Sequence, residues 1–214
     1  MPCNHKFKKD LNLDRLDFEP ETLIVGTFCP EWPDANTAQW FYGRILDAKG
    51  NRSNSFWDVL PRIYNEPGLL HANPVDWKLF CKKHRIALTD LISAVDDADA
   101  GNKEHNKILA SMSDDALEYN FDDFEYVDIV RLLQNNPGIK NVYLTRGVTD
   151  SFWRHLWNPV MQYCNRNQLH DRILLTPAGA NLYQHEAHNA DNPDDVILLV
   201  EDYILRRWQK EWHF

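Results

Sequence analysis

Short apolar runs alternate with amphipathic segments along the chain. Four runs rich in branched apolar residues are predicted to be buried strands. They are residues 22–26, 86–89, 141–145 and 172–176. Apolar positions at helical spacing predict helices between them. These are residues 56–64, 74–84, 124–133, 150–165 and 193–212. Pro61 is expected to end or kink the first helix, because proline breaks the helical hydrogen-bond ladder.

Strands separated by helices are typical of a parallel sheet covered by helices on both faces. We therefore expect an α/β protein with a three-layer α/β/α fold and four parallel strands. A length of 214 residues fits one domain over residues 1–214. Sites in such sheets form beyond the C-terminal ends of the strands. A threonine stands at or just beyond each predicted strand end, at Thr27, Thr89, Thr145 and Thr176.

The net charge of −9 at first argues against a nucleic-acid partner, because nucleic-acid-binding domains are usually basic. The excess is confined to residues 90–128, which hold twelve acidic side chains against Lys103 and Lys107. The rest of the chain is close to neutral, so the charge does not exclude DNA. It predicts weak and strongly salt-sensitive nonspecific binding.

The acidic segment, residues 90–128, has several possible interpretations. An insertion at about residues 96–123 is expected to be a solvated surface or a helical lid. It could also capture a protein partner. Asp96, Asp97 and Asp99 offer carboxylates for a metal, but they lack the D-x-D-x-D-G pattern of a calcium loop.

The sequence contains few features typical of membrane, secreted or metal-binding proteins. No apolar stretch is long enough to span a membrane, and no signal peptide is recognised, so a cytoplasmic location is expected. The cysteines show no C-x-x-C spacing. His185 and His188 do not form an H-E-x-x-H motif. We therefore expect neither a metal nor a cofactor.

Several short motifs occur in a characteristic order. Leu-Ile-Val-Gly-Thr-Phe-Cys-Pro occupies residues 23–30, Phe-Tyr-Gly residues 41–43 and Asn-Ser-Phe-Trp residues 54–57. Ile-Ala-Leu-Thr-Asp-Leu follows at residues 86–91, and Leu-Thr-Pro-Ala-Gly-Ala-Asn at residues 175–181. Together they resemble the uracil-DNA glycosylase superfamily, nearest its hypoxanthine-DNA glycosylase and mismatch-specific uracil-DNA glycosylase branches.

The resemblance implies a four-stranded parallel sheet between helices, as the periodicity also predicts. It implies hydrolysis of the N-glycosidic bond of a deaminated or damaged base, uracil or hypoxanthine, in DNA repair. The base must be flipped out of the duplex, because the bond is shielded inside the stack. The implied partner is DNA with a modified base, and no metal or cofactor is required.

The resemblance also assigns roles to residues. Phe28 stands where most branches carry a catalytic Asn or Asp, and its ring suits stacking on a base. Asn54 then becomes the candidate for positioning the attacking water, as in the hypoxanthine-type branch. An asparagine before a helix equally suits an N-cap, so Asn54 has both interpretations.

The remaining candidates fall into two groups. The base-binding candidates are Phe28, Phe41, Tyr42 and Thr176. The DNA- and phosphate-binding candidates are Thr27, Arg44, Arg52, Gly179 and Asn181. Ordinary packing would also account for the aromatic pair, and a strand-to-helix turn for the last motif.

Two further functions fit the same residues. The absence of a polar residue at Phe28 is compatible with an inactive domain that binds a nucleobase or nucleotide. The acidic segment is compatible with a protein-interaction domain. The oligomeric state is not predicted.

Overall fold

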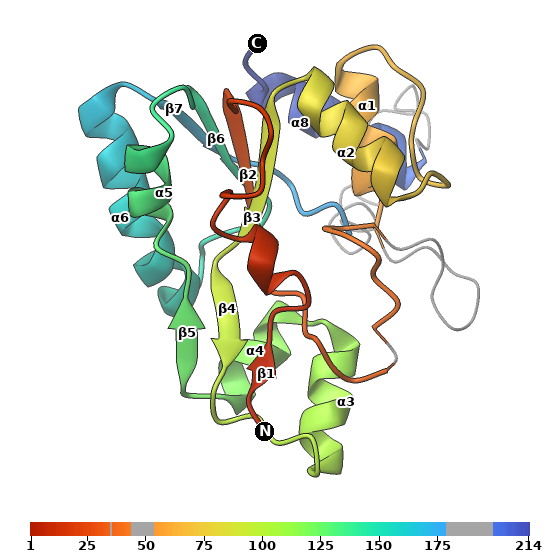
Figure 1. Cartoon of the computed structure of the whole chain (residues 1–214), viewed down its shortest axis with the longest axis vertical. Coiled ribbons are helices and arrows are strands. Elements are labelled where there is room, and N and C mark those ends of the chain that lie inside the picture. The colour runs from red at the N-terminus through yellow and green to blue at the C-terminus, as the bar shows by residue number, and fades with distance from the viewer. Residues whose placement is uncertain (35, 44–53, 179–198) are drawn as a thin grey trace, which may run out of the picture.

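A four-stranded parallel sheet runs through the centre of the molecule (Figure 1). The computed structural model describes residues 1–34, 36–43, 54–178 and 199–214. The strand order is β3-β2-β6-β7, and every neighbouring pair is parallel. The strands are β2 (Thr22–Gly26), β3 (Ile86–Asp90), β6 (Asn141–Leu144) and β7 (His170–Ile173). The predicted α/β fold with four parallel strands is confirmed.

Helices cover both faces of this sheet, and the side chains of β2 show how. Leu23 and Val25 point into a core shared with α5 (Ile129–Asn135) and α6 (Ser151–Asn167). Ile24, between them, points to the opposite core. That core is shared with α1 (Phe56–Ile63), α2 (Pro74–Lys83) and α8 (Val200–Glu211). The alternation produces three layers, with helices on either side of the sheet in Figure 1.

A second, smaller sheet was not predicted. It is antiparallel, has the order β1-β4-β5, and consists of β1 (Cys3–Asn4), β4 (Ile92–Val95) and β5 (Phe124–Tyr126). Strands this short contain too few residues for an alternation of apolar and polar side chains to be recognised in the sequence. β4 also follows β3 after Leu91 alone, so the two strands read as one apolar run.

Two expected elements are shifted. Residues 124–133 were expected to be one helix, but the first part is β5 and the helix begins at Ile129. Asp128 sets this start, because its side chain accepts a hydrogen bond from the Arg131 N–H. The last strand occupies His170–Ile173 rather than residues 172–176. Its register against β6 ends at Leu144 opposite Ile173.

Pro61 has the expected effect on α1. The helix ends at Ile63, two residues beyond the proline. Proline cannot donate to the carbonyl one turn earlier, which is that of Trp57. The Leu69 N–H donates a hydrogen bond to this carbonyl instead, at 2.6 Å. Of the expected closing helix, residues 193–198 lie outside the described part of the chain.

The acidic segment contains two helices, α3 (Lys103–Ser111) and α4 (Asp114–Asn120). Asn102 and Ser113 cap them through side-chain oxygens. Leu109, Leu117 and Phe121 are buried in the core that also contains β2 and α6. The segment is therefore packed against the sheet layer, with most of its charged side chains exposed. Among the described residues, no helix is long and apolar enough to cross a membrane.

Candidate functional site

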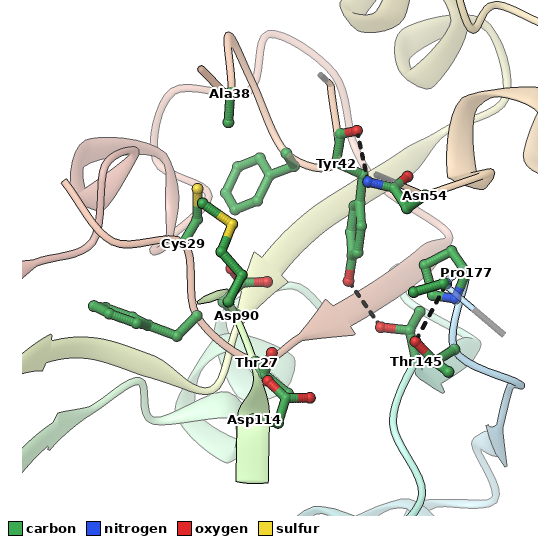
Figure 2. Close-up of a pocket in the computed structure, with 14 residues that line it drawn as sticks. Thr27, Cys29, Ala38, Tyr42, Asn54, Asp90, Asp114, Thr145 and Pro177 are labelled. Carbon is green, nitrogen blue, oxygen red and sulfur yellow. Dashed lines mark hydrogen bonds between the residues drawn. The ribbon is translucent and has the colours of Figure 1, made fainter. Parts of the chain in front are cut away.

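A cavity of about 160 Å³ opens at the C-terminal edge of the parallel sheet (Figure 2). Each strand of that sheet contributes to its wall: Thr27 follows β2, Asp90 ends β3, Thr145 follows β6 and Thr176 lies beyond β7. A cavity of about 150 Å³ can hold a benzene ring. The space is therefore sufficient for one six-membered ring.

Side chains from loops and from the acidic segment complete the wall. They are Phe28, Cys29, Ala38, Phe41, Tyr42, Asn54, Met112, Asp114, Pro177 and Ala178. Six of the candidates named from the sequence line the cavity. These are Thr27, Phe28, Phe41, Tyr42, Asn54 and Thr176. The other four, Arg44, Arg52, Gly179 and Asn181, lie outside the described residues.

Hydrogen bonds join three motifs that are distant in sequence. The Asn54 side-chain Nδ2 donates to the Tyr42 carbonyl at 3.2 Å. The Ser55 backbone N–H donates to the Pro177 carbonyl at 2.9 Å. The Trp57 indole N–H donates to the Phe41 carbonyl at 2.9 Å. The aromatic pair, the start of α1 and the loop after β7 are thus held in one unit.

The Tyr42 side chain is held at both its ring and its hydroxyl group. Its ring stacks on Phe56 with centroids 4.0 Å apart and planes 6° apart. Its hydroxyl lies 2.8 Å from Thr145 Oγ1. Thr145 Oγ1 also lies 3.3 Å from the Val25 carbonyl oxygen, so the two hydroxyl groups and this carbonyl form one hydrogen-bonded chain. Burial, and secondarily the charge of Asp90, raise the pKa of Tyr42 well above its ordinary value.

Asn54 has a structural role whatever else it does. Its Oδ1 accepts from the Phe56 N–H at 3.1 Å, just before the first turn of α1. Ser55 occupies the N-cap position, yet its side chain makes no capping bond. Asn54 therefore caps the helix from one residue earlier and also lines the cavity. Phe56 and Trp57 are fully buried, as expected for core residues.

The two phenylalanines of the wall differ in exposure. Phe41 is almost fully buried and packs against Phe7 at 5.5 Å between ring centroids. Phe28 is half-buried and meets the edge of the His5 ring at 5.8 Å. Phe28 is the more available of the two for stacking on a ligand, because its side chain is only partly buried.

Sequence reasoning missed a buried polar pair at the floor of the cavity. His5 Nε2 lies 2.7 Å from Asp90 Oδ2, and both side chains are shielded from solvent. His5 Nδ1 accepts from the Phe7 N–H at 3.0 Å, so it bears no proton. The imidazole proton is therefore on Nε2 and is donated to Asp90. Asp90 could be located at a strand end from sequence, but its histidine partner, 85 residues away, could not.

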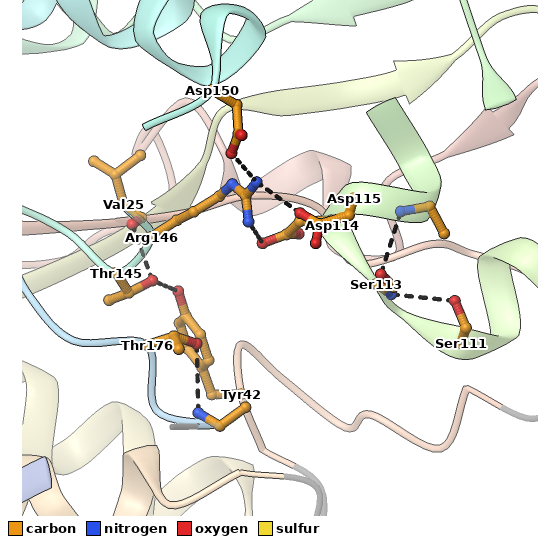
Figure 3. Close-up of polar contacts among 12 residues, drawn as sticks. Val25, Tyr42, Ser111, Ser113, Asp114, Asp115, Thr145, Arg146, Asp150 and Thr176 are labelled. Atoms are coloured by element: carbon orange, nitrogen blue, oxygen red, sulfur yellow. Dashed lines mark hydrogen bonds and ion pairs between the residues drawn. The ribbon is translucent and has the colours of Figure 1, made fainter. Parts of the chain in front are cut away.

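The acidic segment supplies a second missed carboxyl group. Asp114, the first residue of α4, lines the cavity and is hydrogen-bonded to Thr27. Partial burial raises its pKa above the ordinary value, although Thr27 and Arg146 act in the opposite direction. Figure 3 shows Arg146, just beyond β6, reaching the carboxylates of Asp114, Asp115 and Asp150.

The chemistry of the described wall is aromatic and acidic. No lysine or arginine is among the described residues that line the cavity. Within the same part of the chain, no group of three His, Cys, Asp or Glu side chains could hold a metal ion. The predicted phosphate ligands Arg44 and Arg52 lie outside the described residues, so the described wall includes neither of them.

Comparison with known proteins gives one informative result. No family model matches the chain, and no curated protein matches it significantly. The solution NMR structure of a candidate uracil DNA glycosylase from Methanosarcina acetivorans matches with a TM-score of 0.51 and 18% sequence identity. The match covers 92% of this chain and 94% of that one. The fold is uracil-DNA glycosylase-like. At this level of identity the likeness concerns the fold alone.

Proposed function

We propose that this protein is a DNA glycosylase-like hydrolase that cleaves the N-glycosidic bond of a deaminated base, uracil or hypoxanthine, in DNA. The observation that carries the proposal is the convergence of Tyr42, Asn54 and Pro177 on one ring-sized cavity. These residues belong to the three motifs that resemble the superfamily. The fold of the matching structure supports the same interpretation.

The wall suits a base that has left the DNA stack. Phe28 offers a half-buried ring, and the ring of Tyr42 lines the same cavity (Figure 2). Stacking on aromatic side chains contributes roughly 1–3 kcal/mol per base. Bond cleavage then needs a positioned water and stabilisation of the charge that develops on the sugar and the departing base.

Two polar groups of the wall fit the water-positioning role. Asn54 stays our candidate because its amide is oriented by Phe56 and Tyr42 and faces the cavity. Asp114 approaches from the acidic segment and carries a carboxyl group. In this proposal Asn54 orients the water, while the negative charge of Asp114 stabilises the cationic sugar. The predicted phosphate contacts of Thr27, Arg44, Arg52, Gly179 and Asn181 belong to the same proposal.

The test is single-turnover release of base from oligonucleotides containing uracil or hypoxanthine. The wild type should release at least one of them, and Asn54→Ala should lower the rate by about 10²-fold or more, as expected for loss of a positioned catalytic group. Asn167→Ala, on an exposed face at the end of α6, is the matched control and should retain the rate. No release from single- or double-stranded substrates would contradict the proposal.

A specific observation favours one alternative, a domain that binds a nucleobase without cleaving. Both polar ends of the Asn54 amide are already bonded to backbone. If these bonds fix the side chain for structure alone, base binding would persist without hydrolysis. Wild-type protein that binds free base, yet releases none from DNA, would select this alternative.

A further inference from the structure

A second cavity, of about 180 Å³, lies between β3 and the N-terminal segment that runs beside it (Figure 1). The segment is tied to the strand, because Thr89 Oγ1 donates to the Leu11 carbonyl at 2.8 Å. Ile86 and Leu88 of β3 line the second cavity. Asp90, two residues later on the same face of the strand, lines the cavity at the sheet edge, the first cavity. The two cavities therefore follow one another along β3.

The interior of the second cavity is apolar. Phe18, Trp40 and Phe41 supply aromatic side chains, and Cys81 of α2 supplies a thiol. Burial raises the pKa of this thiol well above its ordinary value, so the thiol stays uncharged. A cavity of about 150 Å³ can hold a benzene ring, so the second cavity has room for one ring. An apolar ring that enters it leaves water, which favours binding.

Four charged side chains also line the second cavity, and both carboxylates among them already have partners. Asp10 Oδ1 lies 3.6 Å from Arg15 Nη1. Asp17 Oδ2 lies 2.6 Å from Nζ of Lys82 on α2. Lys78, which is exposed, forms no ion pair with any residue that the structure describes. The described wall therefore carries one positive charge without a counterion.

Trp40 connects this charge to the interior. Lys78 Nζ lies over the Trp40 ring, 5.5 Å from its centroid. Trp40 itself is only 7% exposed, and its indole Nε1 has no hydrogen-bond partner within the described ranges of the chain. A buried donor that lacks an acceptor is unfavourable. The second cavity thus combines an apolar interior with an unpaired cation and an unpaired donor.

We propose that the second cavity binds an organic acid that has one apolar ring and a single carboxylate. The ring occupies the apolar interior, and the carboxylate pairs with Lys78. A carboxylate has two oxygens, so it can also supply the acceptor that the Trp40 N–H lacks. A cationic ligand is disfavoured, because the carboxylates of the wall are paired and the remaining charge is positive. A nucleotide is too large for a cavity that holds one ring.

This site goes beyond the proposed glycosylase function, because it needs neither DNA nor a base. Phe41 lines both cavities, so a test must show which of the two a ring-bearing acid enters. The chain offers a residue specific to each. Of the two cavities, Phe28 lines only the first and Lys78 lines only the second.

The experiment titrates the full chain, labelled with ¹⁵N at the tryptophan indoles, with benzoate at neutral pH and follows the indole signals by NMR. Trp40→Phe identifies the Trp40 signal among those of the eight tryptophans. Benzoate should shift this signal and saturate it at millimolar concentration. Acetate has the charge without the ring, and benzyl alcohol has the ring without the charge. Both should bind about fivefold more weakly than benzoate, or weaker still.

Lys78→Met removes the charge and keeps an unbranched side chain, and calorimetry measures its effect without any NMR assignment. Because Lys78 is exposed, the variant should fold. Its affinity for benzoate should fall about fivefold, while its affinity for benzyl alcohol should not change. Lys107→Met makes the same charge change at an exposed position on α3 and is the control, which should keep both affinities.

Three results would overturn the inference: equal binding of benzoate and benzyl alcohol to the wild type, an equal loss of affinity in the two lysine variants, or no shift of the Trp40 signal.

Phe28→Ala separates the two cavities. This variant should keep the wild-type affinity for benzoate, and Lys78→Met should keep the wild-type affinity for hypoxanthine. Loss of benzoate binding in Phe28→Ala would place the acid in the first cavity and overturn the inference. Release of base from DNA without benzoate binding would support the glycosylase and overturn the second site. Benzoate binding that depends on Lys78, without release of any base, would support the second site and count against hydrolysis.

Discussion

Arg146 Nη1 lies 3.3 Å from Asp114 Oδ2, and this contact joins the end of β6 to the start of the acidic helix α4. The same guanidinium reaches Asp115 at 3.0 Å and Asp150 at 3.1 Å, and it lies over the Trp153 ring at 4.5 Å. The local negative charge of the segment is therefore partly balanced by one cation from the sheet layer.

Replacement of Arg146 by alanine should destabilise the protein by about 1–3 kcal/mol. The guanidinium is only 14% exposed, and its loss leaves three carboxylates close together. The partly exposed carboxylates moderate the cost. Urea unfolding measures the change. Arg146→Lys should recover only part of it, because lysine lacks the planar fork.

The matched control is Arg166→Ala. Arg166 is exposed near the end of α6, and its contact is with Gln162 on the same helix. Its removal should change the free energy of unfolding by less than about 0.5 kcal/mol. Equal effects at the two arginines would show that Arg146 does not hold the acidic helix in place.

The raised pKa of Asp114 predicts a pH dependence of stability. A carboxyl group whose pKa is higher in the folded state stabilises the fold when protonated, and this contribution is lost as the pH rises through the folded pKa. Asp114→Asn removes the titrating group. The free energy of unfolding of the variant, measured relative to that of the wild type, should therefore increase as the pH rises from near 3.8 to neutrality.

Measurement of unfolding by urea at several pH values tests this sign. Asp122→Asn, in the same segment but exposed, serves as the control. Its free energy of unfolding should show the same pH dependence as that of the wild type. A variant that loses stability relative to the wild type as the pH rises would mean that the Arg146 contact outweighs the burial of the carboxylate.

Gly26 should not tolerate a side chain. A Cβ there would meet Asp90 Oδ1 and the Tyr42 hydroxyl at distances shorter than any real contact, so both floor oxygens must shift. Gly26→Ala is expected to cost about 1–3 kcal/mol of stability and to weaken base binding. Gly147→Ala is the comparison, because nothing lies within 4 Å of a Cβ at that position.

Phe28→Ala should weaken base binding by about five- to 150-fold, equivalent to the roughly 1–3 kcal/mol of one stacking contact. Phe28 is half-buried, so the loss of stability should be modest. Calorimetric titration with hypoxanthine measures the affinity. Phe28→Leu should show a similar loss if stacking matters, and near-normal affinity if the side chain only fills space.

The sequence predicted the layers of the fold better than the limits of its elements. Buried runs such as residues 22–26 were recognisable because every side chain is apolar or small and the run ends in a glycine. The β1-β4-β5 sheet was missed because its strands have two to four residues. The strand at residues 124–126 was taken for helix, because its apolar spacing continues into the following helix.

The candidate site was predictable where one motif supplies the residue. Tyr42, Asn54 and Thr176 were located in this way, and all three line the cavity. Asp114, which lines the cavity, and His5, which contacts the cavity residue Asp90, were not predicted, because each lies in a segment that no motif marks. Their positions depend on the β1–β4 pairing and on the Arg146 contact, which only tertiary structure reveals.

The contact between His5 and Asp90 has a consequence for the order of folding. The two residues are 85 positions apart, and the pairing of β1 with β4 spans a similar distance. Contacts of such separation form slowly, because a long loop must close first. The β2–β6 pair joins residues that are farther apart still, since Thr22 lies opposite Asn141. The central sheet therefore gains no head start over the docking of β1. Ligand affinity and burial of the tryptophans should appear in the same refolding phase, and a rapid-mixing experiment that follows both signals would check this.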